Sequence, residues 1–131
     1  MKTRELLEND FSSMVKMMTQ GIRHINLDPK EVEVAHRKLA GAQKKQCFNN
    51  AFKALHGPNT KYVLGYVFFH NIPIEHAWIK DGDEYFDVTL NPKDQQGYVS
   101  VIEFSLDEIM PYVNKFHSAP SLYDINRFLG K

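Results

Sequence analysis

The sequence predicts an α+β domain, with helices packed on a small antiparallel sheet. Two observations carry this prediction. Near both ends of the chain, apolar residues recur every three or four positions, as they do in amphipathic helices. Between these segments lie β-branched and aromatic runs separated by turn residues, which are typical of strands joined by hairpins. The chain has 131 residues, the size of one ordinary core, so we expect a single domain over residues 1–131.

The composition is that of a folded globular protein, with 43% hydrophobic and 24% charged residues. The charges balance to a net +0, so the electrostatic signature of nucleic-acid or anionic-membrane binding is absent. The sequence has neither the apolar run of a secretory signal nor one that is long enough to span a bilayer. We therefore expect a cytoplasmic protein with no nucleic-acid or membrane partner, and the oligomeric state stays open.

Two helices are expected before the strands. The first covers residues 3–20 and ends at Gly21. The second covers residues 28–40, because Asp28 followed by Pro29 is a typical helix start.

The rest of the chain divides into a short helix, four strands and two further helices. A short helix begins near Gln46 and is stopped by Gly57 and Pro58, so that Cys47 lies in its first turn. Strands are expected at 61–69, 74–80, 84–90 and 98–104, and helices at 105–116 and 121–129. Gly65, within the first of these strands, is a candidate bulge.

Cys47 is the only cysteine, so it forms no internal disulfide, which fits a reducing compartment. On composition alone, a free cysteine is most often a buried and inert core residue. A thiol at a helix start, however, faces unpaired backbone N–H groups and the positive end of the helix dipole, which stabilise a thiolate and can hold an oxyanion. Cys47 is therefore a candidate nucleophile.

His76 and Asp87 are candidates for its base and for the carboxylate that orients this base. If Asp-Gly at residues 81–82 forms a two-residue turn, His76 lies directly opposite Asp87, close enough for a hydrogen bond. The alternative turn at residues 82–83 sets Thr89 opposite His76 and is expected to turn Asp87 to the other face. Without the cysteine, the two residues would be read as a core histidine and a strand end.

Four segments carry a recognisable combination: a helix-start cysteine, a strand with Gly-Tyr, a His-Ala-Trp strand, and an aspartate followed by a small residue and threonine. They are QCFNNA at 46–51, YVLGY at 62–66, HAWI at 76–79 and YFDVTL at 85–90. Together they resemble the transglutaminase-like branch of the papain-like cysteine enzyme superfamily, over roughly residues 44–92. Lys45 stands where that family usually has glycine, and Phe48 where it has tryptophan.

The resemblance implies a papain-like/transglutaminase-like core, with Cys47 as nucleophile, His76 as general base and acid, and Asp87 as orienting carboxylate. It implies chemistry on the amide bonds of a protein or peptide substrate, through an acyl-thioester and without a cofactor. The reaction is peptide or isopeptide cleavage, glutamine deamidation or acyl transfer to an amine.

Supporting groups are expected around this triad. The expected oxyanion donor is the backbone N–H of Cys47, or the side-chain amide of Gln46 or Gln43. A glutamine at either position is more often a surface residue than an oxyanion donor. Trp78 follows His76 by two residues on the same strand face, where it shields the catalytic pair or simply anchors the core.

Two other functions compete with an enzyme: metal binding, and protein binding without catalysis. The six histidines lack the spacing of metal ligands, so no metal site is expected. A catalytically inactive binding or inhibitor module on the same fold is the alternative to an enzyme, because a fold does not ensure an activity.

Overall fold

One six-stranded sheet forms the centre of the fold, in the order β1-β6-β3-β4-β5-β2. The structure, a computed structural model, describes residues 11–23 and 25–130. Its strands are β1 (Lys30–Val32), β2 (Val34–His36), β3 (Thr60–Phe69), β4 (Ile72–Asp81), β5 (Glu84–Asp87) and β6 (Gly97–Phe104). Neighbouring strands are antiparallel except β2 and β5, which are parallel. The α+β class is confirmed, but the sheet is mixed rather than purely antiparallel.

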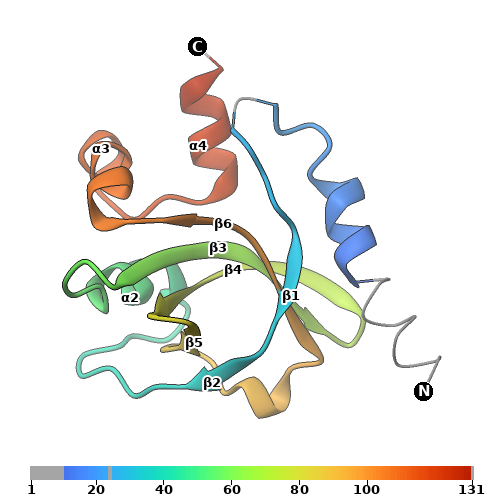
Figure 1. The fold of residues 1–131 in the computed structure, drawn as a ribbon, viewed down its shortest axis with the longest axis horizontal. Coiled ribbons are helices and arrows are strands. Elements are labelled where there is room, and N and C mark those ends of the chain that lie inside the picture. The colour runs from blue at the N-terminus through green and yellow to red at the C-terminus, as the bar shows by residue number, and fades with distance from the viewer. Residues whose placement is uncertain (1–10, 24, 131) are drawn as a thin grey trace.

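The sheet curls until its two edges approach each other. β1 and β2 are the outermost strands, yet only Glu33 separates them along the chain. One short segment therefore pairs with β6 at its start and with β5 at its end, and in Figure 1 it crosses in front of the other strands. Every strand contributes to an apolar cluster on the concave face, made of Val63, Val67, Trp78 and Tyr98 with Val32, Val34, Tyr85 and Leu90 around them.

The helices cover the outer face of the sheet. They are α2 (Cys47–Lys53), α3 (Leu106–Phe116) and α4 (Leu122–Leu129), with a 3-10 turn η1 (Pro92–Asp94), and residues 11–18 are also helical. Figure 1 shows α3 and α4 together on one side of the sheet. Their apolar side chains form the larger core with Tyr62, Leu64 and Phe68 of β3. Because strand residues alternate between faces, β3 contributes to both cores.

The irregularity predicted at Gly65 is present, but its extra residue lies on the partner strand: Leu64 pairs with Ile102 and Gly65 with Ser100, which leaves Val101 of β6 as the bulged residue. A side chain could not fit at this position. A Cβ on Gly65 would lie 2.0 Å from the carbonyl oxygen of Val99 and 2.8 Å from the ring of Trp78. The glycine therefore lets two strands and the tryptophan approach closely.

The elements predicted after residue 90 are confirmed, and the structure shows a capping box at the start of both α3 and α4. The strand predicted over residues 84–90 ends earlier, at Asp87. The reason is the Asp87 side chain, which accepts hydrogen bonds from the backbone N–H groups of Thr89 and Leu90 and so turns the chain out of the sheet.

The helix predicted over residues 28–40 is wrong, because the two short strands β1 and β2 occupy this segment. Its apolar positions Val32 and Val34 recur with a period of two, and both face the concave cluster. The backbone N–H of Asp28 donates to the carbonyl of Val101, 2.8 Å away, instead of opening a helix. Pairing with β6 and β5 outweighs the local helix-start signal.

The helix predicted over residues 3–20 is present at residues 11–18, and the earlier part of that prediction lies outside the described residues. Its Phe11 ring stacks on Phe68 of β3, with ring centroids 4.1 Å apart. Among the helices of residues 11–23 and 25–130, none is long and apolar enough to cross a membrane.

Candidate active site

The β4–β5 hairpin turns at Gly82 and Asp83, one residue later than the favoured prediction. Ile79 pairs with Phe86 across this turn, and Gly82 takes the left-handed conformation at φ 62. Glycine at the first turn position suits the positive φ that a two-residue hairpin turn requires. The favoured register is thus wrong, and the register that was expected to turn Asp87 away is the one that forms.

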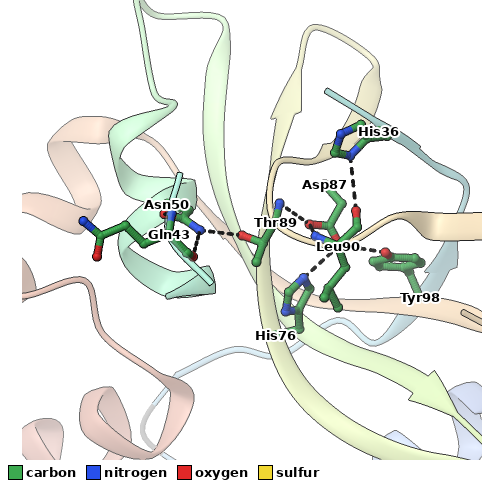
Figure 2. Close-up of polar contacts among 8 residues, drawn as sticks. All are labelled: His36, Gln43, Asn50, His76, Asp87, Thr89, Leu90 and Tyr98. Carbon is green, nitrogen blue, oxygen red and sulfur yellow. Dashed lines mark hydrogen bonds and ion pairs between the residues drawn. The ribbon is translucent and has the colours of Figure 1, made fainter. Parts of the chain in front are cut away.

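His76 and Asp87 nevertheless meet. Moving a two-residue turn by one position shifts the strand pairing by two residues, which leaves each side chain on its original face, so the expected inversion does not follow. Asp87 becomes a diagonal neighbour of His76, and its Oδ2 lies 2.8 Å from Nε2 of the imidazole (Figure 2). His76 is 3% exposed and Asp87 is 0% exposed.

The carboxylate of Asp87 accepts four hydrogen bonds. Oδ1 accepts from the N–H groups of Thr89 and Leu90, at 2.8 and 2.9 Å. Oδ2 accepts from the hydroxyl of Tyr98 at 2.6 Å in addition to the bond with His76. Burial alone would raise the pKa of Asp87, but the hydrogen bond and the positive charge of His76, followed by Tyr98 and Leu90, hold the pKa below its usual range. Asp87 is therefore an ionised acceptor.

The imidazole of His76 responds to both of its partners. Burial would lower its pKa, but hydrogen bonding to Asp87 and Cys47, and the negative charge of both, raise the pKa of His76 to about 9. This direction favours the protonated ring. Because Nε2 faces Asp87, Nδ1 is the ring nitrogen that remains for Cys47.

Cys47 is the first residue of α2 and is half-buried. No side chain caps this end of the helix at Gln46, so the first backbone N–H groups have no side-chain acceptor. Lys45 has φ 61, the left-handed region that costs a non-glycine residue roughly 1–2 kcal/mol. The chain therefore makes, with a lysine, a bend for which glycine is better suited.

The structure thus brings His76 and Asp87 together, with Cys47 among the groups that raise the pKa of His76, and it arranges the glutamines differently. The side chain of Gln46 is bound through its Oε1 to the amide of Asn49, at 3.3 Å. The side chain of Gln43 points away from His76 and Asp87 in Figure 2, while its backbone is held by Asn50. A role for either amide at an oxyanion stays a prediction.

Trp78 packs directly beside His76, as expected whether it shields His76 and Asp87 or anchors the core. Its ring stacks over His76, with centroids 6.0 Å apart and planes 26° apart. It meets Tyr98 edge-on, with centroids 5.1 Å apart. Trp78 is fully buried, so it forms an apolar wall of the concave face against His76.

Two residues that matter here were not found from the sequence. Tyr98 lies on β6, and no local pattern in the sequence indicates which residue of β6 will contact Asp87 at the end of β5. Asn50 gave a signal that could have been used, because it is a polar residue next to Ala51 on the buried side of α2. A buried amide on an apolar helix face has to be hydrogen-bonded, and so usually has a specific partner.

Within residues 11–23 and 25–130, no group of three or more His, Cys, Asp or Glu side chains could hold a metal ion. No protein-family model, curated protein sequence or solved structure matches the chain.

Proposed function

We propose that this protein is a cysteine-dependent hydrolase or acyltransferase that acts on amide bonds through Cys47, His76 and Asp87. The observation that carries the proposal is the environment of the His76 imidazole. Its Nε2 lies 2.8 Å from the Asp87 carboxylate, and despite burial its pKa is raised to about 9 by Asp87 and Cys47. A histidine held between a carboxylate and a thiol is suited to proton transfer in acyl chemistry.

The reaction begins when the Cys47 thiolate attacks the carbonyl carbon of the substrate amide. The carbonyl oxygen takes up the electron pair and becomes an oxyanion, for which the backbone N–H of Cys47 is the proposed donor. The His76 imidazolium gives its proton to the amide nitrogen as the C–N bond breaks. An amine or ammonia leaves, and an acyl-thioester remains on Cys47.

Water then resolves the thioester. Neutral His76 takes a proton from water as its oxygen attacks the thioester carbon, and the C–S bond breaks to return the thiolate. The product is a carboxylic acid, and His76 is an imidazolium again. Asp87 does not carry the proton in either half; it keeps the imidazole oriented and stabilises its charged form.

The same proposal includes the type of core, the substrate, the nucleophile that resolves the thioester and the cellular compartment. A papain-like/transglutaminase-like core is supported by a helix-start cysteine on α2, which contacts the histidine-bearing strand β4. The substrate is a protein or peptide, and hydrolysis comes before amine transfer because a small domain leaves the thioester open to water. A reducing compartment such as the cytoplasm suits the free thiol of Cys47.

The test is capture of the acyl group. Wild-type protein is incubated with a library of peptides that includes glutamine side chains, and mass spectrometry follows Cys47 while ammonia and amine release are assayed. We expect an acyl adduct and release that Cys47→Ser and His76→Ala abolish. The proposal fails if no adduct forms across the library while wild type and Cys47→Ala bind the same cellular partner equally well, which would identify a binding module.

A further inference from the structure

The side chain of Asn50 holds the backbone just in front of the nucleophile. Asn50 is fully buried. Its Oδ1 accepts from the N–H of Gln43 at 3.0 Å, and its Nδ2 donates to the carbonyl of Gln43 at 2.8 Å. Both backbone groups of Gln43 are thus tied to α2, and the same carbonyl also accepts from the N–H of Gln46 at 3.3 Å. The segment that leads into Cys47 is fixed by one amide.

The same amide reaches the other half of the site. Its Nδ2 also donates to the hydroxyl of Thr89 at 3.0 Å. The backbone N–H of Thr89 in turn donates to Oδ1 of Asp87 at 2.8 Å, and Oδ2 of Asp87 binds His76. Figure 2 shows this unbroken path from Gln43 through Asn50, Thr89 and Asp87 to the imidazole.

We infer that Asn50 and Thr89 are positioning residues, which fix the separation between Cys47 on α2 and His76 on β4. This inference rests on the proposed function. The nucleophile and its base lie on different elements, and the link between Asn50 and Thr89 joins the first turn of α2 to the segment that directly follows Asp87 at the end of β5. A displacement of about 1 Å between reacting groups can cost about 100-fold in rate.

The chemistry of this link requires an amide and a hydroxyl. Both N–H donors of Asn50 are used, one on a carbonyl and one on the Thr89 hydroxyl, so a carboxylate of the same size would face the Gln43 carbonyl with no proton to offer. Thr89 contributes its hydroxyl to this link and its backbone N–H to Asp87. Removing the hydroxyl alone therefore breaks the link and leaves the bond to Asp87 in place.

The experiment compares Thr89→Val, which has nearly the same shape, with Thr89→Ser, which keeps the hydroxyl. The readout is the rate of Cys47 alkylation by iodoacetamide from about pH 5 to about pH 9, which reports how well the thiolate is paired with the imidazolium. Unfolding in urea is measured in parallel. Thr60→Val is the control, because Thr60 is likewise hydrogen-bonded through its hydroxyl, to His56, and is buried, whereas Thr89 is half-buried.

Thr89→Val is expected to lose about tenfold in the alkylation rate at about pH 6 and to change the shape of the pH profile. Thr89→Ser is expected to recover most of that rate, and Thr60→Val to lose stability with the profile unchanged. Thr89→Ala serves as a second variant that removes the hydroxyl without adding bulk, and the same direction is expected.

Two results would overturn the inference, and they differ. If Thr89→Val and Thr89→Ala lose stability as Thr60→Val does but keep the wild-type profile, the link is only structural and the proposed function stands. If wild-type Cys47 itself reacts as an ordinary thiol over the whole range and no amide is turned over, the proposed function fails and the positioning role fails with it.

Discussion

Tyr98 on β6 donates its hydroxyl hydrogen to Oδ2 of Asp87, the same oxygen that binds His76, at 2.6 Å. Burial, and then the charge and hydrogen bond of Asp87, raise the pKa of Tyr98, so the phenol stays protonated and remains a donor. Since β6 and β5 are not neighbours in the sheet, this bond crosses the concave face. The Asp87 carboxylate is therefore supported from a strand with which β5 does not pair.

Tyr98→Phe removes this donor and leaves the ring in place. We expect the unfolding free energy to fall by about 1.5–3 kcal/mol, as for hydrogen bonds to charged groups, and amide turnover to fall by less than it does in Asp87→Asn. Urea unfolding and kcat measure the two effects. Tyr85→Phe is the control, because it also removes a tyrosine–carboxylate bond, to Glu103, away from the site. Equal kcat in both variants would count against a role for Tyr98 in orienting Asp87.

The pH dependence of stability follows from His76. Its pKa in the folded protein, raised to about 9 by Asp87 and Cys47 against the effect of burial, lies above the unfolded value of about 6.5. Its contribution is therefore complete below about pH 6.5 and is lost as the pH rises through about 9. Asp87, with a lowered pKa, contributes above its unfolded pKa of about 4 and loses this contribution in acid.

We therefore expect the unfolding free energy to fall by on the order of 2 kcal/mol between about pH 7 and about pH 10. Urea titrations at several pH values measure it, and the difference between wild type and His76→Gln isolates the histidine. A parallel decline in both proteins would show that other groups cause the pH dependence.

Gly65→Ala tests the close approach at the bulge. The added Cβ would lie 2.0 Å from a backbone oxygen of Val99, and backbone cannot move aside as a flexible side chain can. We expect a loss of more than about 3 kcal/mol, or no folding at all. Gly21→Ala is the matched control, since nothing lies within 4 Å of a Cβ there. Thermal unfolding that is equal in the two variants would contradict this account of Gly65.

Several parts of this structure could be predicted because their causes are local. The capping boxes at Ser105 and Ser121 use residues three apart, and both are formed. Cys47 heads a helix as its flanking pattern indicates. These features depend on hydrogen bonds within one turn, so the nearby sequence determines them.

The remaining parts depend on partners distant in sequence. β1 and β2 form because β6 and β5 offer free edges, and the helix signal at Asp28 contains no information about those edges. The hairpin turn at residues 82–83 and the turn predicted at residues 81–82 differ by one residue, and only the packing of both strands selects the first of them. Tyr98 reaches Asp87 through the curl of the sheet, and Asn50 of α2 reaches Thr89 from 39 residues away in the sequence; no local pattern describes either contact.

The proposed mechanism makes one claim about His76, that its imidazole is held as an imidazolium between Cys47 and Asp87. Its most direct test is an NMR titration of the His76 ring nitrogens, with the signals assigned by their loss in His76→Gln. We predict that the ring stays protonated through neutral pH with a pKa of about 9, and that Cys47→Ser and Asp87→Asn each lower this value. A His76 that titrates near the unperturbed value of about 6.5, and is unaffected by Cys47→Ser, would contradict the claim.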